Sequence, residues 1–298
     1  MTMSVDTMGD MSVPVPDGSI NVWHRPGGED SVTAVLIHGL SGNSRWWGRV
    51  IAHLPDHTGV IALDARGRAG SADAPPPYDL TTIADDIGRV LDHIELDRAV
   101  VAGYSMGGWV AALFGVRHPA RAQRLVLVDG GFPLPRDPDA DVEEIIDAVV
   151  GPSLRRLDRE FATRDAYLDY WRAHPAFVDH WEDSMEAPLG HELEAHRNGF
   201  RVRANRGAIE MAAREITVGR EANEASAHLE VASHLIVVER GTTDQPGGMI
   251  PLEVAEEAAA ANSEVTMQFL ADVNHYTLLL GRGAHSVAAA IAPGWLPS

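Results

Sequence analysis

The residues best suited to chemistry in this chain form a serine turn, Gly103-Tyr104-Ser105-Met106-Gly107. The apolar run Ala99–Ala102 leads into this turn, and a helical pattern beginning at Gly108 leaves it. A sharp connection from strand to helix places the serine at its apex in strained backbone angles, and small neighbours let the strand and the helix approach. A match this short also fits an ordinary glycine-bounded connection, but with these flanking elements it predicts that Ser105 is an activated nucleophile.

A serine hydroxyl needs a neighbouring base, and imidazole titrates in the right range. Because the chain has 14 histidines, other landmarks must select the base. The ordered landmarks are the serine turn and four further segments: Ile37-His38-Gly39-Leu40, Asp64-Ala65-Arg66-Gly67, Gly241-Thr242-Thr243-Asp244 and Asn274-His275. Together they resemble the α/β-hydrolase superfamily over nearly the whole chain. The resemblance implies an α/β fold, with a mostly parallel central sheet flanked by helices and an inserted helical cap.

The resemblance also implies that His275 is the general base. His275 follows the apolar strand Val265–Phe269 and precedes the last helical pattern, which matches the C-terminal histidine loop of the family. His38 is its main rival. In the family a histidine before this glycine supports the loop beside the site, so we expect a structural role for His38.

The third member of a catalytic triad holds the imidazole in one tautomer. Asp244 fits the family order of serine, acid and histidine, because it closes a Gly-x-x-Asp turn after the strand Leu235–Val238. Asp129 is the alternative acid. It ends the run Leu125–Val128, and a minority of the superfamily carries the acid at that place.

Acyl transfer develops a negative oxygen that needs prepositioned donors. The resemblance implies that the backbone N–H groups of Leu40 and Met106 form this oxyanion hole. One departure affects the loop nearby: relatives commonly show R-G-x-G-x-S where this chain has Arg66-Gly67-Arg68-Ala69-Gly70-Ser71. Because alanine replaces the second glycine, we expect the positive-φ position to be displaced or unnecessary. Serine at position 105 argues against epoxide hydrolases and haloalkane dehalogenases, which need a carboxylate nucleophile.

The elements that must position these residues alternate along the chain. Alternation around Pro16-Asp17-Gly18 predicts an N-terminal β-hairpin over 12–23. Short apolar runs predict buried parallel strands at Val32–Ile37, Val60–Leu63, Ala99–Ala102, Leu125–Val128, Leu235–Val238 and Val265–Phe269. Helical patterns lie between them at Ser44–Leu54, Thr81–Ile94, Gly107–Arg117, Leu252–Ala261 and Gly281–Ile291.

The alternation fails once, between Val128 and Leu235. We therefore expect a hydrolase core over 1–132 and 229–298 and a helical cap over 133–228, with helices at Leu154–Ala162 and Arg164–Ala173. The cap holds seven of the chain's 18 aromatic residues within 40 positions: Phe161, Tyr167, Tyr170, Trp171, Phe177, Trp181 and Phe200. Trp171 and Trp181 are candidate pocket residues, although aromatic side chains also pack helices together.

Composition excludes several classes of protein. The formal net charge of −19 disfavours nucleic acid and anionic lipid as partners, and the absence of cysteine removes thiol chemistry and disulfides. The opening Met1–Asp10 lacks the features of a signal peptide, and no run reaches the ~18 apolar residues of a membrane helix. We expect a cytoplasmic protein that needs no cofactor and no metal.

Taken together, the sequence predicts a serine hydrolase that cleaves a carboxylic ester or lactone of a mostly apolar small molecule through an acyl-enzyme on Ser105. A carbon–carbon bond hydrolase or a haloperoxidase-like enzyme would use the same triad. A ligand receptor built on the hydrolase fold is the alternative from another class. The sequence does not fix the oligomeric state.

Overall fold

The computed structural model describes residues 8–28, 31–134 and 141–292; the first seven residues of the Met1–Asp10 opening lie outside this range. In this described part, eight strands form one sheet in the order β1-β2-β4-β3-β5-β6-β9-β10. The strands of the sheet are β1 (Gly9–Val15), β2 (Gly18–Arg25), β3 (Thr33–Ile37), β4 (Gly59–Leu63), β5 (Ala99–Tyr104), β6 (Ala122–Val128), β9 (Ser233–Arg240) and β10 (Val265–Asn274).

The sheet is mostly parallel. The hairpin β1–β2 and the pair β2–β4 are antiparallel, whereas β4, β3, β5, β6, β9 and β10 run parallel to one another. The central strands β4 and β5 are buried at every residue, which explains why their sequences are apolar runs with no alternation. The predicted hairpin, the predicted strands and the fold class are confirmed.

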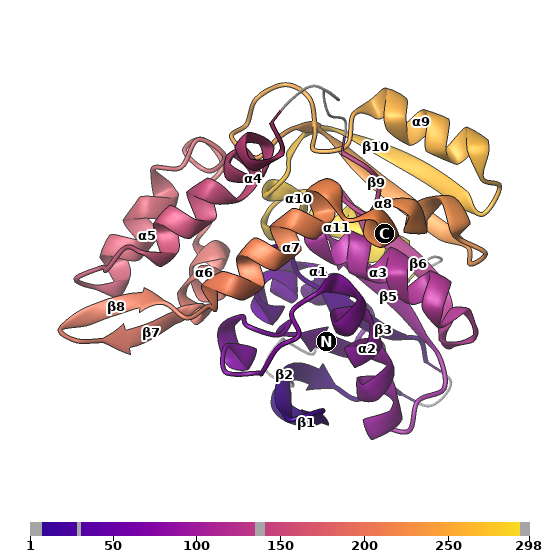
Figure 1. The fold of residues 1–298 in the computed structure, drawn as a ribbon, viewed down its shortest axis with the longest axis horizontal. Coiled ribbons are helices and arrows are strands. Elements are labelled where there is room, and N and C mark those ends of the chain that lie inside the picture. The colour runs from indigo at the N-terminus through magenta and orange to yellow at the C-terminus, as the bar shows by residue number, and fades with distance from the viewer. Residues whose placement is uncertain (1–7, 29–30, 135–140, 293–298) are drawn as a thin grey trace.

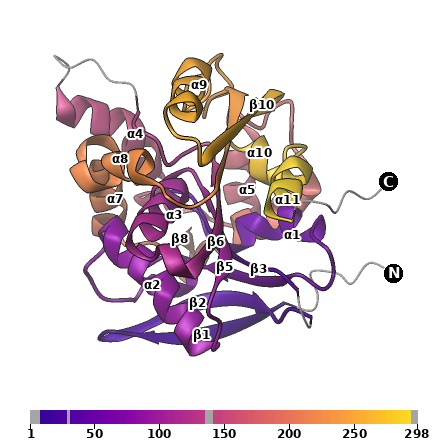
Figure 2. The same cartoon turned by 90° about the vertical axis from the view of Figure 1, so that its right-hand side faces the viewer.

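Helices cover both faces of the sheet, as Figures 1 and 2 show. Residues of α2, α3 and α9 join one hydrophobic cluster, and residues of α1, α10 and α11 join the other. These helices are α1 (Gly48–Ala52), α2 (Leu80–His93), α3 (Met106–Arg117), α9 (Leu252–Ala261), α10 (Thr277–Leu280) and α11 (Ala284–Ile291). Five of them correspond to the predicted helical patterns, with 44–47 forming a 3₁₀ turn before α1, whereas α10 was not predicted.

The segment between β6 and β9 is largely helical. It contains α4 (Val142–Leu157), α5 (Arg164–Arg172), α6 (Glu186–His191), α7 (Arg206–Val218) and α8 (Arg220–Glu224), and a hairpin of β7 (Leu193–His196) with β8 (Gly199–Val202). In Figure 1, α5, α6 and this hairpin extend to one side of the sheet, while α7 returns across the core. The helix predicted over 154–162 is wrong in its bounds, because α4 ends at Leu157. The hairpin of β7 with β8 was not predicted.

No helix within the described residues is both long enough and apolar enough to span a membrane.

Candidate active site

Ser105 lies at a sharp turn between β5 and α3. Its backbone adopts φ 54° and ψ −123°, which is rare for a residue with a side chain. A Cβ on Gly103 would lie 1.8 Å from the Gly107 carbonyl oxygen, and a Cβ on Gly107 would lie 2.2 Å from the Ile37 carbonyl oxygen. The two glycines therefore permit the close approach that holds the strained serine, as its sequence context predicts.

His275 follows β10 and is paired with Asp129. Its Nδ1 lies 2.6 Å from Oδ2 of Asp129, which is fully buried at the end of β6. The ring of Tyr104 stacks on the imidazole at 4.8 Å between centroids, and the Tyr104 hydroxyl donates to the His275 carbonyl at 3.0 Å. Because Nδ1–H donates to the carboxylate, Nε2 is left as the acceptor that a base requires.

The structure corrects the prediction for Asp244. Its Oδ1 accepts a hydrogen bond from Asn274 Nδ2 at 2.9 Å and forms an ion pair with Arg240 Nε at 3.0 Å. Partial burial raises the pKa of Asp244, but the hydrogen bonds from Arg240 and Asn274 outweigh it, so the pKa is lowered. Asp244 therefore lies beside the residue before His275, and the carboxylate that faces the imidazole belongs to the alternative acid, Asp129.

Asp129 reaches the histidine because of the sheet order. Strand β6 lies directly beside the nucleophile strand β5, and the Ser105 N–H donates to the Val128 carbonyl at 2.9 Å. The parallel strands therefore end together, and the first residue after β6 lies at the same edge of the sheet as the first residue after β5. Oδ1 of Asp129 is in turn approached by the Ile250 N–H at 3.5 Å.

His38 is placed for support rather than for proton transfer. Its Nδ1–H donates to the Gly39 carbonyl at 2.7 Å, and the Ala65 N–H donates to its Nε2 at 3.0 Å. Burial lowers the pKa of His38 to about 4, so the ring is neutral at physiological pH. Both ring nitrogens are occupied by backbone groups, and this agrees with the structural role expected for His38.

Ser105 and His275 line one small cavity of about 70 Å³. Its other lining residues are Gly39, Leu40, Ser41, Gly42, Trp46, Tyr104, Ser153, Ile216, Thr242, Met249 and Tyr276. The Ser105 hydroxyl lies 4.0 Å from the sulfur of Met249. Leu40 is thus at the cavity wall, and Met106 is the first residue of α3, where a backbone N–H has no partner within its own helix.

The two candidate pocket tryptophans, Trp171 and Trp181, do not line this cavity. Trp171 is buried within an aromatic cluster, with its ring centroid 5.6 Å from that of Phe177 and 5.7 Å from that of Tyr276. Trp181 packs against Phe177 and lies under the guanidinium of Arg172. Tyr276, which packs against Trp171, also lines the cavity, and its place directly after His275 was the signal that could have identified it.

In the loop after β4, the residue at position 69 adopts positive φ although it is an alanine. Ala69 adopts φ 40°, and Gly67 adopts φ 76°. The expectation that this conformation is displaced or unnecessary is wrong. A hydrogen bond from the Ala69 N–H to the Arg203 carbonyl at 2.9 Å helps to hold the alanine in this region.

A larger groove of about 1120 Å³ lies between the first helical turns of the core and helices α5 and α6. Its lining includes Trp23, Arg49, Leu168 and His191, and it shares no residue with the cavity at Ser105. Within the described residues, no three His, Cys, Asp or Glu side chains are grouped so that they could hold a metal ion.

Comparison with known proteins defines the class. A sequence model described as the alpha/beta hydrolase fold matches residues 34–205. The chain therefore belongs to the α/β-hydrolase family.

Individual relatives are similar over about two thirds of the chain. "Putative carbamate hydrolase RutD" of Caulobacter sp. (strain K31) is 30% identical over 193 residues, which cover 62% of this chain and 65% of the relative. "Putative 2-succinyl-6-hydroxy-2,4-cyclohexadiene-1-carboxylate synthase" of Bacillus subtilis (strain 168) is 32% identical over 210 residues, which cover 67% of this chain and 69% of the relative. Among solved structures, E-2-(acetamidomethylene)succinate hydrolase superposes with a TM-score of 0.77 at 17% identity, covering 95% of this chain and 97% of that one, which shows a shared fold.

Proposed function

We propose that this protein is a serine hydrolase that cleaves a carboxylic ester or lactone through an acyl-enzyme on Ser105. The observation that carries the proposal is the hydrogen bond of 2.6 Å from His275, which lines the same cavity as the strained Ser105, to the buried carboxylate of Asp129. A nucleophile, a base and a group that orients the base are the parts that acyl transfer requires.

In the proposed mechanism, Oγ of Ser105 attacks the substrate carbonyl carbon while Nε2 of His275 accepts the hydroxyl proton. Asp129 keeps the ring in the required tautomer and stabilises its protonated form. The backbone N–H groups of Leu40 and Met106 bind the negative oxygen of the tetrahedral intermediate. The leaving alkoxide takes the proton from His275, and a water molecule then repeats the attack on the acyl-enzyme. No step uses a metal or a cofactor.

The cavity favours a compact, mostly apolar acyl group. Its volume of about 70 Å³ is far below the ~300–1,000 Å³ of pockets for drug-sized ligands. Leu40, Trp46, Ile216 and Met249 supply apolar walls, and the hydroxyls of a few small residues supply polarity. We therefore infer that short-chain esters and small lactones fit better than the bulky substrates that cap tryptophans would have selected.

We also propose that residues 133–228 act as a cap on a core formed by 1–132 and 229–298. Ser153 on α4 and Ile216 on α7 both line the cavity, so the insertion closes over the serine. The hydroxyl of Ser153 lies 3.2 Å from that of Ser41, which belongs to the loop after β3. The insertion thus contributes to the wall of the cavity and contacts the loop after β3.

The test is a substrate panel with a labelling control. Purified protein is assayed with p-nitrophenyl acetate, butyrate and octanoate, small lactones, vinylogous 1,5-diketones and an aryl carbamate, the last because one relative is named a carbamate hydrolase. We expect the short esters or lactones to be hydrolysed fastest. Preferential cleavage of the diketones would instead support carbon–carbon bond hydrolysis.

A fluorophosphonate probe tests the nucleophile directly. Wild type should be labelled covalently, and Ser105→Ala should lose both labelling and hydrolysis. Ser153→Ala is the matched control, because it removes a second serine hydroxyl from the same cavity and should keep the labelling. Labelling that persists in Ser105→Ala would refute the mechanism.

A further inference from the structure

Arg68 is a buried cation whose hydrogen-bond acceptors are all uncharged. Its guanidinium donates to the carbonyl oxygens of Leu40 at 3.1 Å, Arg66 at 2.7 Å and Ala208 at 3.1 Å, and to the sulfur of Met106 at 3.5 Å. The side chain is fully buried. In the described part of the chain, no carboxylate forms an ion pair with it, so its positive charge has no direct counterion.

Two other buried arginines, Arg66 and Arg156, are paired with acids, whereas Arg25 donates to backbone carbonyls as Arg68 does. Arg66, two residues away, donates to Asp86 at 2.9 Å, and Arg156 forms an ion pair of 2.7 Å with Glu192. Burying a charge without a partner costs several kcal/mol. Burial lowers the pKa of Arg68 to about 10, so the guanidinium still carries its proton at neutral pH. A role that uses this charge would account for its retention.

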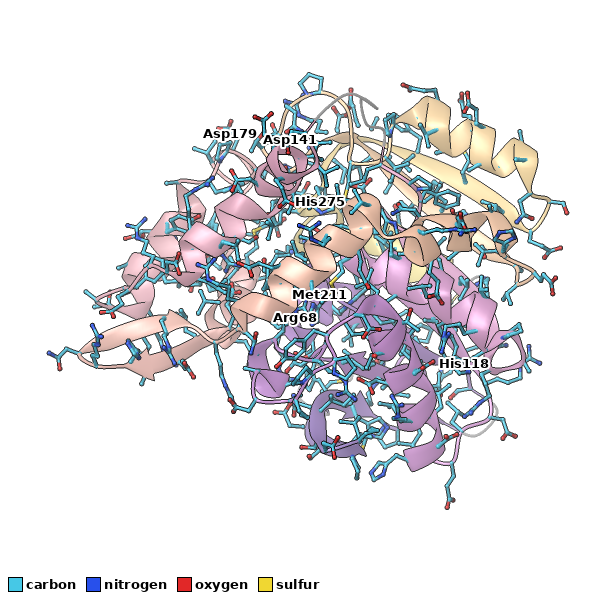
Figure 3. The ribbon with its side chains drawn as sticks, in the orientation of Figure 1. Arg68, His118, Asp141, Asp179, Met211 and His275 are labelled. Atoms are coloured by element: carbon cyan, nitrogen blue, oxygen red, sulfur yellow. The ribbon has the colours of Figure 1, made fainter. Side chains whose placement is uncertain are left out.

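The residues that Arg68 contacts point to that role. Leu40 and Met106 are the two residues whose backbone N–H groups are proposed to bind the oxyanion. Arg68 holds the carbonyl of the first and the side chain of the second, and it also reaches α7 through Ala208. Figure 3 places Arg68 inside the molecule, where α7 crosses the core loops.

The positive charge of Arg68 suits this role. In the proposed mechanism the proton of Ser105 moves to His275 while a negative charge develops on the substrate oxygen. A cation that contacts both residues whose N–H groups bind this oxygen stabilises that charge, and it does so more strongly in a buried site than in water.

We propose that Arg68 is a positioning residue of the oxyanion hole, which fixes Leu40 and Met106 and whose charge favours the negative tetrahedral intermediate. This inference rests on the proposed serine hydrolase mechanism. The alternative is a purely structural role, in which Arg68 only ties the loop after β4 to the loop after β3 and to α7.

The test compares Arg68→Gln and Arg68→Lys with Arg25→Gln in the full chain. Arg25 is a matched control, because its guanidinium is also buried and donates to backbone carbonyls. Its acceptors are Thr58 and Pro55, whereas those of Arg68 include Leu40 and Met106. Each variant is measured for its thermal melting point, its kcat and KM on p-nitrophenyl acetate, and its affinity for phenylboronic acid. Boronic acids form a tetrahedral anion on the nucleophilic serine and so resemble the charged intermediate.

We expect Arg68→Gln to lower kcat and boronate affinity on the order of 100-fold each, with KM changed less than about threefold, as the loss of an oxyanion-stabilising group does. The kcat and boronate affinity of Arg68→Lys should lie between those of Arg68→Gln and wild type. The lysine ammonium keeps the charge, but it lacks the several planar N–H donors of a guanidinium. Arg25→Gln should lower the melting point without lowering kcat. A folded Arg68→Gln protein that keeps kcat and boronate affinity within about threefold would overturn the proposal.

If Arg68→Gln does not fold, the lysine variant carries the test. A buried lysine loses its proton at lower pH than a guanidinium does. The ratio of boronate affinity between Arg68→Lys and wild type should therefore fall as the pH rises from 7 to 9.5. His38 and Tyr78, the titratable groups that act on Arg68, are present in both proteins, so the ratio reports on position 68. A ratio that is constant with pH would overturn the role of the charge.

Failure of this inference is distinguishable from failure of the mechanism. If wild type neither hydrolyses the ester nor reacts with fluorophosphonate, the proposed function is wrong. If wild type does both and the Arg68 variants behave as Arg25→Gln does, only the role of Arg68 is wrong.

Discussion

Replacing Asp129 by asparagine should nearly abolish turnover while preserving the shape of the site. In the variant the amide NH₂ would face Nδ1 of His275, so the ring would carry its proton on Nε2 and could not accept the proton of Ser105. A flipped amide would present its oxygen to Nδ1 but would turn its NH₂ toward the Ile250 N–H, which now approaches Oδ1 at 3.5 Å. That mismatch costs about 1–3 kcal/mol, or roughly 5- to 150-fold.

The loss of the carboxylate charge adds to this effect, because nothing else touching Nδ1 would stabilise the imidazolium. We therefore expect kcat to fall roughly 10³- to 10⁴-fold, which corresponds to about 4–5.5 kcal/mol in the barrier. Asp244→Asn is the matched control. Its carboxylate is partly exposed and pairs with Arg240, a contact worth about 1 kcal/mol or less, so kcat should stay within about threefold of wild type.

The assay is the initial rate of p-nitrophenyl acetate hydrolysis over a range of substrate concentrations, with thermal melts of each variant to confirm folding. A larger fall of kcat in Asp244→Asn than in Asp129→Asn, with both proteins folded, would refute the assignment of the acid.

Four further outcomes are expected. Burial lowers the pKa of His38 from 6.5 to about 4. Between these pH values the unfolded chain binds a proton at His38 and the folded protein does not. The contribution of His38 to the free energy of unfolding is therefore full above pH 6.5 and falls by roughly 3 kcal/mol toward pH 4. His38→Gln should therefore show a smaller drop in urea midpoint than wild type between pH 7 and 4.5, and equal drops would contradict this. Ile216→Ala should raise kcat/KM for the butyrate relative to the acetate on the order of fivefold by widening the cavity. Trp171→Ala should instead destabilise the fold by about 3–5 kcal/mol with little change in that ratio, and the opposite pattern in urea titrations and rates would return Trp171 to the pocket. Dialysis against EDTA should leave kcat unchanged, whereas activity lost and then restored by zinc would require a metal step.

The sheet could be predicted from the sequence because each central strand is buried on both faces and therefore reads as an apolar run. The serine turn could be predicted because Gly103 and Gly107 meet backbone atoms so closely that no side chain fits. In both cases the residues that identify the feature in the sequence are the same residues that form it in the structure. The hairpin β7–β8 was missed because its strands are only four residues long, so that the alternation of apolar and polar residues in Leu193–His196 and Gly199–Val202 is too short to stand out from chance.

The acid could not be selected from sequence because the choice depends on which strand end lies opposite His275. Asp129 and Asp244 each follow a predicted strand, and both adopt positive φ. Only the order β5-β6-β9 and the ion pair of Asp244 with Arg240 separate them. Aromatic composition likewise indicated a cluster at Trp171 without showing which ring of that cluster, Tyr276, meets the cavity.

In the proposed mechanism, the position of the acid after β6 means that the loop after β9 carries no catalytic carboxylate. In the arrangement first expected, residues 241–248 would have carried the acid, and any insertion there would have moved it. Here Thr242 and Met249 of that region contribute only to the cavity wall, and the nearest link to the acid is the Ile250 N–H at the end of the loop. Loops of other lengths could therefore be grafted between Gly241 and Gly248 to alter which molecules enter, while the bond-breaking apparatus stays anchored to the sheet. Substrate selectivity could therefore change through this loop while the proposed nucleophile, base and acid keep their positions.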